Sequence, residues 1–130
     1  MRAADVAEIK ARLTSIGADP YEQKPATTPP REYVVIYGGE ARSRRERLAA
    51  VQITNRQVWR LMCVSASLDV LRILAVKVAA EFTNSRIGGP QGGPVEEVDV
   101  GPELTDGTGP DLRYSQTLTF AHHHTRRTTP

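Results

Sequence analysis

The chain is poor in the residues that build disulfide frameworks, membrane spans and aromatic binding surfaces. Among its 130 residues there is one cysteine, Cys63, and aromatic residues make up 5%. A single cysteine excludes an internal disulfide, and its apolar neighbours favour a buried, inert thiol over a nucleophile. No apolar run approaches the ~20 residues of a membrane-spanning helix. Residues 1–10 also lack the apolar segment of a signal peptide, so we expect a soluble protein that folds inside the cell.

Motifs that carry catalysis are missing as well. There is no G-x-S-x-G elbow, no H-E-x-x-H and no phosphate-binding loop, because the glycines of 88–93 follow a helix rather than a strand. Strand alternation would place Glu97 and Asp99 on one face, which favours a solvated strand edge over a metal site. In the run His122–His124 only the first and third histidines would share a face, and no other ligand is local. We therefore expect no enzyme activity, no cofactor and no metal site.

The strongest positive signal is the stretch 57–87. Alternating residues from Val58 to Val64 predict a strand that is apolar on both faces, apart from Arg60. The spacing then changes to that of a helix beginning at Leu68, with Ser67 as its N-cap candidate. This helix is apolar on more faces than one sheet can cover. Its surplus apolar surface predicts an oligomer.

The remaining segments complete an α+β pattern. Residues 3–17 form an amphipathic helix with Val6, Ile9, Leu13 and Ile16 on one stripe. The expected order continues with a Pro-rich connector without regular structure (18–31), a strand (32–38), a long hairpin, a short strand (95–100), a loop (101–111), a final strand (112–120) and a polar C-terminal tail (122–130). We predict one domain over 1–130, with two helices packed on a mainly antiparallel four-stranded sheet that carries a long β-hairpin.

The net charge is only +2, but the basic residues are unevenly distributed. Four arginines gather at the expected hairpin tip, where the interleaved Glu40 and Glu46 reduce the local positive field. Further candidates for contacts with an oligomer neighbour, a connector or a DNA-containing lumen are Arg56 and the two C-terminal arginines. The set of candidate interaction residues is Arg42, Arg44, Arg45, Arg47, Arg56, Arg126 and Arg127. A solvated loop, a protein contact and a phosphate contact all stay open. Sequence-specific DNA recognition is disfavoured, because no helix-turn-helix or zinc-ligand pattern accompanies the cluster.

This layout resembles the tail terminator (tail completion) proteins of long-tailed bacteriophages, in the versions carried by phages of actinobacteria. The resemblance lies in the strand YVVIY at 33–37, the passage VWRLMCVSAS at 58–67, the helix LDVLRILAVKV that follows directly, and the closing strand RYSQTLTF at 113–120. It covers about residues 3–122.

The resemblance implies a structural virion protein located at the head-proximal end of the tail. Proteins of this kind form hexameric rings that cap the tail tube, stop its polymerisation and offer a surface to the head–tail connector protein. The implied partners are the tail tube protein, that connector and DNA passing through the lumen without sequence specificity; no membrane is implied. The alternatives are a head–tail connector (neck) protein or a small DNA-binding module.

Overall fold

The computed structural model describes residues 3–23, 31–38, 41–45, 52–83, 85–88 and 92–127. In 41–45, 52–55 and 124–127 it describes the backbone only. The described residues form two α-helices, a short 3-10 helix and seven strands. In chain order these are α1 (Ala3–Ser15), β1 (Pro20–Glu22), β2 (Glu32–Tyr37), β3 (Ala41–Arg45), β4 (Gln52–Ser65), α2 (Leu68–Phe82), β5 (Glu96–Val100), β6 (Leu104–Asp106), the 3-10 helix (Gly109–Asp111) and β7 (Arg113–Arg127).

Two long antiparallel strands form the spine of the sheet. β4 and β7 pair over their whole shared length, from Gln52↔Arg127 to Ser65↔Tyr114. The main strand order is β1-β2-β4-β7-β5, while β3 also pairs with β4 and β6 also pairs with β7. Two strands therefore lie along each long side of the spine. On one side, β2 and then β3 pair with β4. On the other side, β5 and β6 pair with β7.

The α+β class is confirmed, but the prediction of a four-stranded, mainly antiparallel sheet was wrong. The described sheet is seven-stranded and mixed, because β1 runs parallel to β2. Three short strands arise in segments that composition marks as connector, hairpin tip or loop: β1, β3 and β6. Each lies beside a longer strand that supplies its hydrogen bonds, so pairing outweighs the low intrinsic strand propensity of these segments.

The first of these strands shows how a proline-rich connector joins a sheet. Pro20 is the first residue of β1, where a missing backbone N–H is tolerated at a sheet edge. The backbone N–H of Val34 donates to the carbonyl of Asp19, and that of Gln23 donates to the carbonyl of Ile36, both over 2.9 Å. The connector is therefore regular over Pro20–Glu22.

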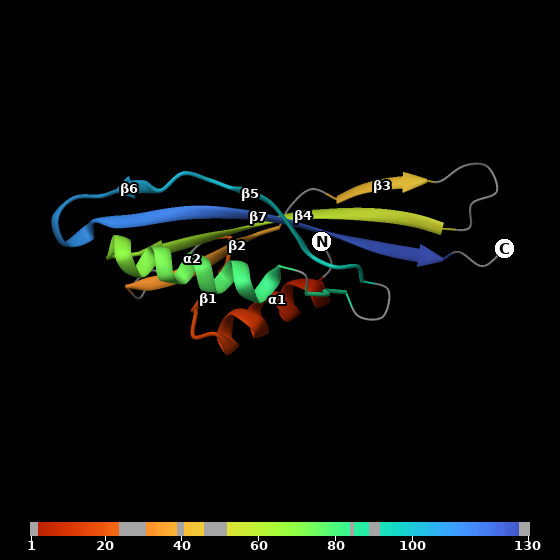
Figure 1. Cartoon of the computed structure of the whole chain (residues 1–130), viewed down its shortest axis with the longest axis horizontal. Helices are drawn as coiled ribbons and strands as arrows, with labels where there is room; N and C mark the ends of the chain where they lie inside the picture. The colour runs from red at the N-terminus through yellow and green to blue at the C-terminus, as the bar shows by residue number, and fades with distance from the viewer. Residues whose placement is uncertain are drawn as a thin grey trace.

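Both helices lie on one face of the sheet, where they enclose the main core (Figure 1). The side chains of Trp59 on β4 and Phe120 on β7 stack with ring centroids 5.0 Å apart, and Phe82 of α2 meets Trp59 edge-on at 5.4 Å. Ile9 and Leu13 of α1 are completely buried, as the helical stripe predicts. The aliphatic members of the core are Val34, Ile36, Leu61, Leu71, Leu74, Val78, Ile87, Val95 and Leu118, with Cys63 among them.

The other face of the sheet carries a smaller apolar cluster. Tyr33, Val35 and Val64 are buried there, and Tyr21 meets Tyr33 edge-on with ring centroids 6.0 Å apart. The alternation in β4 is thus apolar on both faces, as predicted, because each face contributes to a separate cluster.

Helix α2 begins where the sequence predicts, after Ser67, but the Ser67 side chain makes no capping hydrogen bond. Ser67 is the N-cap of α2, and its carbonyl accepts the first helical bond from the N–H of Leu71 at 2.9 Å. Its hydroxyl makes no capping hydrogen bond; instead the hydroxyl of Ser65 accepts a bond from the N–H of Ser67 at 3.1 Å. The side chain that stabilises the turn before α2 is therefore Ser65, the last residue of β4.

The spine continues beyond the helices as a three-stranded ribbon. β3, the first part of β4 and the last part of β7 run past the end of α1, on the right of Figure 1. We call residues 41–45, 52–56 and 123–127 the extension. The register joins them directly, since Arg45 pairs with Ile53 and Ile53 with Arg126.

Candidate interaction surfaces

The extension brings together most of the arginines that the sequence singled out. Arg42, Arg44 and Arg45 lie on β3, Arg56 lies on β4, and Arg126 and Arg127 lie on β7. The described extension contains these six arginines and two histidines, and its sequence has no Asp or Glu. The expected loop is therefore a strand over 41–45, while Arg47 lies outside the described residues. The sheet register, which the sequence did not reveal, joins the hairpin arginines to the C-terminal pair.

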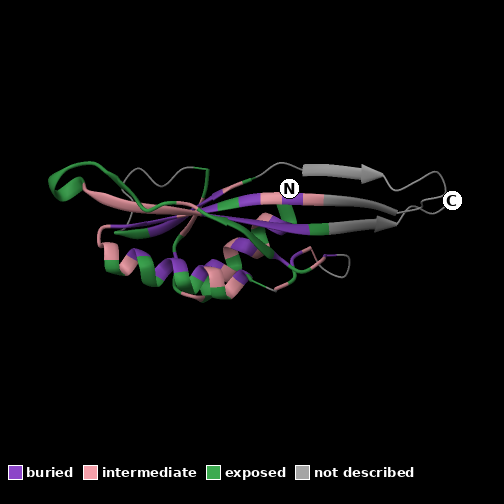
Figure 2. Ribbon diagram, turned by 45° about the horizontal axis from the view of Figure 1, so that its top comes forward, coloured by how far each residue is buried: buried purple, intermediate pink, exposed green. Residues whose placement is uncertain are grey.

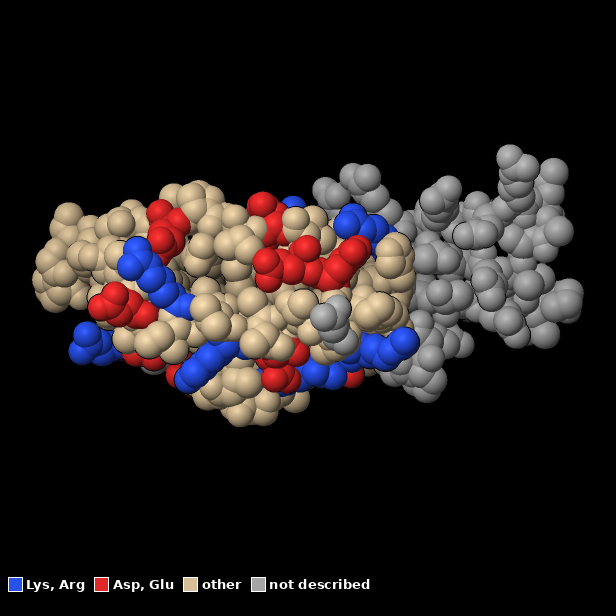
Figure 3. Space-filling view, viewed as in Figure 1, with Lys and Arg blue, Asp and Glu red and all other residues tan. Residues whose placement is uncertain are grey.

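Opposite charge lies along the other long side of the sheet. Residues 96–106, which we call the acidic edge, hold β5 and β6 and contain five acidic residues and no Lys or Arg: Glu96, Glu97, Asp99, Glu103 and Asp106. Every residue of β5 and β6 is exposed. Figure 3 shows acidic side chains gathered in the region of β5, with few basic ones among them. The signal was present in the sequence as a run of eleven residues without a basic one.

A bulge in β5 divides this charge between the two faces of the sheet. Glu97 pairs with Phe120, but Asp99, two residues later, pairs with Thr119, which is adjacent to Phe120 in β7. Adjacent residues of a strand point to opposite faces, so Glu97 and Asp99 face opposite sides and the expectation that they share a face was wrong. The extra residue is Val98, which is 46% exposed.

A groove of about 300 Å³ runs between α2 and the acidic edge. Its lining is apolar along the middle, from Val76 and Ala79 of α2 to Val100 of β5. At one side the guanidinium of Arg72 donates to both carboxylate oxygens of Glu103, at 3.0 and 3.4 Å. This carboxylate raises the pKa of Arg72, and both residues of this partly exposed ion pair line the groove.

The outer face of α2 supplies the surplus apolar surface that the sequence predicted. Ile73 is 57% exposed and Val76 is 69% exposed, and Leu104 of β6 is 57% exposed. Figure 2 shows buried and exposed residues following one another along α2, as expected for a helix with one face on the core. Apolar side chains and acidic side chains therefore share one side of the molecule.

The histidine run extends the last strand, as expected of a polar strand extension, but its first histidine is buried rather than exposed. β7 continues through it, and the side chain of His122 is completely buried. The indole N–H of Trp59 donates to Nδ1 of His122 at 3.0 Å, and Nε2 of His122 lies 3.8 Å from Oδ2 of the buried Asp5. This chain of contacts joins β4, β7 and α1, and it makes His122 a structural residue. Among the described residues no group of His, Cys, Asp and Glu is arranged to hold a metal ion.

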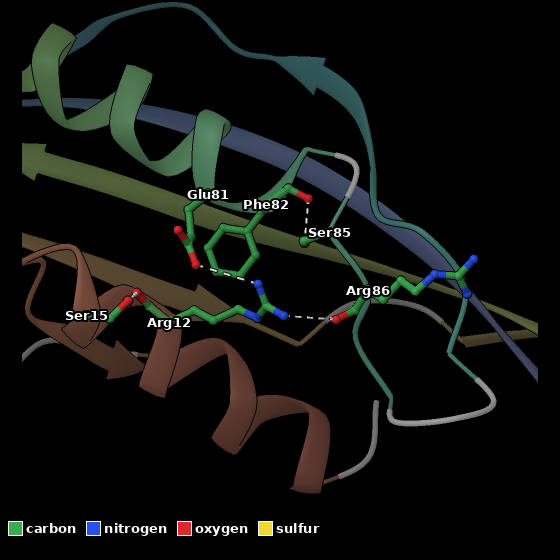
Figure 4. A network of polar contacts seen from close by, with 6 residues as sticks. All are labelled: Arg12, Ser15, Glu81, Phe82, Ser85 and Arg86. Atoms are coloured by element: carbon green, nitrogen blue, oxygen red, sulfur yellow. Dashed lines mark hydrogen bonds and ion pairs between the residues drawn. The ribbon is translucent and has the colours of Figure 1, made fainter.

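A second polar network holds the two helices together on their outer side (Figure 4). Arg12 of α1 lies 3.6 Å from the carboxylate of Glu81 on α2, and its guanidinium donates to the carbonyl of Arg86 at 3.1 Å. Arg86 in turn donates to the carbonyl of Gly92 at 3.0 Å.

The core thiol of Cys63 is buried as predicted, and burial raises its pKa to about 12. These features stabilise the scaffold and offer no reactive group.

None of the helices in the described part of the chain is long and apolar enough to cross a bilayer. No family model matches the sequence, and no curated protein does.

Solved structures do match the fold. One is a chain in the virion of a native gene transfer agent particle, with a TM-score of 0.63 and 11% identity over 94% of this chain and 92% of that chain. A second solved chain has a TM-score of 0.54 and 19% identity over 99% of this chain and 91% of that one. The chain shares its fold with both. At such low identity the likeness concerns the fold, and it spans almost the whole of each chain.

Proposed function

We propose that this protein is a structural virion component that forms a ring at the head-proximal end of a phage tail tube. There it ends polymerisation of the tube and provides the surface to which the head side joins. It acts without catalysis, through contacts with copies of itself, with the tail tube protein and with the head–tail connector protein. DNA passes through its lumen without being read.

One observation carries this proposal: the fold likeness, over almost the full length, to a chain from the virion of a gene transfer agent particle. It agrees with the sequence resemblance to tail terminators, which rests on residues 33–37, 58–67 and 113–120. The first uses the path of the backbone, and the second uses the order of the elements and their local sequence pattern.

The surfaces of the protein support assembly rather than chemistry. Exposed apolar residues such as Ile73 and Val76 form a surface that a small monomer would keep covered. Charge of one sign gathers on the extension and charge of the other sign on the acidic edge. Both features are typical of protein–protein contacts.

Electron microscopy of the purified protein with tail tubes tests the proposal. The tubes are assembled from a purified phage tail tube protein. A ring at one tube end, together with tubes that stop growing when it is added, is the expected result. Binding to the portal-side connector without binding to tubes would favour a neck protein instead. Binding to neither would contradict the proposal.

The extension supports one candidate of a different class, a small nucleic-acid-binding module. Six arginines without an acidic residue would contact phosphates, and such binding weakens steeply with salt. Salt-sensitive binding of DNA by the isolated protein, together with no interaction with tubes or connector, would favour that function.

A further inference from the structure

The small net charge of the chain hides two strongly charged regions of opposite sign. The described extension carries six arginines and no acidic residue, and the acidic edge carries five acidic residues and no Lys or Arg. Within one chain Arg56 Nη2 lies 4.0 Å from Glu96 Oε1, and the two side chains are 38% and 60% exposed. A partly exposed pair of this kind contributes little. Glu103 of the acidic edge is also paired with Arg72, so the contrast between the two regions rests on their composition.

Both regions are also open edges of the same sheet. Among the described residues, β3 pairs only with β4, while β5 and β6 pair only with β7. Open edges tend to pair with other chains, and charged side chains restrict which edges they accept. A basic edge repels another basic edge, and an acidic edge repels another acidic one. The charge pattern therefore disfavours symmetric pairing of like edges and leaves the pairing of unlike edges.

We propose that the extension of one copy docks along the acidic edge of a second copy, next to the groove between α2 and β5. The contact is head-to-tail, so each protomer uses both surfaces and the chain of contacts closes into a ring or continues as a filament. The inference rests on the proposed ring-forming function and deepens it by naming the two surfaces that meet.

The apolar residues beside the acidic edge strengthen the choice of a protein neighbour. Val76, Val100 and Leu104 are exposed along the same side of the molecule as the carboxylates. The aliphatic part of an arginine side chain covers such a surface while its guanidinium reaches an acid. A nucleic acid would account for the extension alone, because its phosphates would be repelled by the acidic edge. A second copy accounts for both.

Charge-swap variants of the full chain test the proposal. One variant reverses the extension with Arg44→Glu and Arg45→Glu, and the other reverses the acidic edge with Glu97→Lys and Asp99→Lys. The exposed pair Glu22 and Glu32, at β1 and the start of β2, gives a matched control, with Glu22→Lys and Glu32→Lys. The readout is the molar mass in solution by sedimentation equilibrium over a range of protein and salt concentrations.

The wild-type protein is expected to self-associate at low salt and to dissociate as salt screens the contact. Either swap alone should raise the apparent Kd by about tenfold or more, because attraction is replaced by repulsion at two positions. Mixing the two swap variants should restore association, since the reversed extension of one then meets the reversed edge of the other. The control variant should associate like the wild type.

Several results would overturn the proposal. They are a wild-type protein that stays monomeric under all conditions, swap variants that associate like the wild type, a mixture no better than its components, and association that requires added DNA. The ring-capping function is judged separately, by the presence of rings on tubes. Rings on tubes formed by both swap variants would therefore refute this inference while leaving that function in place.

Discussion

The two halves of the β4–β7 spine differ in what covers them. From Gln57 to Ser65, β4 passes over two helices, and its residues Trp59, Leu61 and Cys63 are completely buried. From Gln52 to Arg56 the same strand continues into the extension, which no described helix covers (Figure 1). Backbone pairing is continuous across both halves. The β-ladder is therefore common to both halves, while the described side chains buried beneath the two helices belong to one half.

The largest expected difference between the halves comes from the core tryptophan. Trp59→Ala removes a side chain that contacts Phe82, Phe120 and His122, and should lower the free energy of unfolding by about 3–5 kcal/mol. Ile53→Ala, six residues earlier in the part of the strand that no described helix covers, should change it by less than about 1 kcal/mol. Urea unfolding followed by circular dichroism measures both. Equal losses would show that the extension has a core of its own.

The reactivity of Cys63 measures how tightly the covered half is closed. Burial raises its pKa from 9.0 to about 12, so the thiol stays protonated at pH 8. The raised pKa means that the folded protein holds about a thousandfold less thiolate below pH 9 than a thiol with an unshifted pKa. Labelling by a thiol reagent at pH 8 should therefore be slow in the folded protein and fast in urea. Rapid labelling of the native protein would mean that the covered half opens locally.

The adjacent histidines give a matched pair at the boundary of the two halves. His122→Leu leaves the buried N–H of Trp59 without the acceptor that it has at 3.0 Å, which should cost roughly 1–3 kcal/mol of stability. His123→Leu changes an exposed neighbour and should cost almost nothing. Thermal unfolding of the two variants compares them directly. If both were neutral, the contact with Trp59 would contribute nothing to stability.

The covered half is also the part that sequence reasoning predicted well. Helical spacing placed Ile9 and Leu13 in the core, and the change of period at Leu68 marked the start of α2. The same reasoning missed β1, β3 and β6 because their strand character comes from pairing with a neighbour rather than from alternation. It also missed the burial of His122, since a histidine in a polar run carries no mark of a tryptophan 63 residues away in the sequence.

The candidate surfaces were predicted in part. The arginines were singled out from their clustering, but the sheet register was needed to join Arg42–Arg45 with Arg126 and Arg127. In the sequence alone, Glu97 and Asp99 indicate a solvated strand edge or a metal site and not an interaction surface. The acidic edge becomes a candidate interaction surface because it lies along the opposite side of the sheet from β3. That placement is a property of the topology, which composition does not reveal.

The smallest expected effect on stability, and the sharpest separation of the two halves, comes from removing the charge of the hairpin arginines. Replacing Arg42, Arg44, Arg45 and Arg47 by Gln should leave the free energy of unfolding within about 0.5 kcal/mol of wild type, because no described helix covers β3 and charges that are not packed in a core contribute little to folding. If the extension serves assembly, the same variant should lose ring formation or head joining, measured as infectious particles after complementation. A stable variant that assembles poorly would separate folding from assembly along a single β-strand ladder. An unfolded variant, or one that yields particles as well as the wild type, would show that the extension does not have the role that its charge indicates.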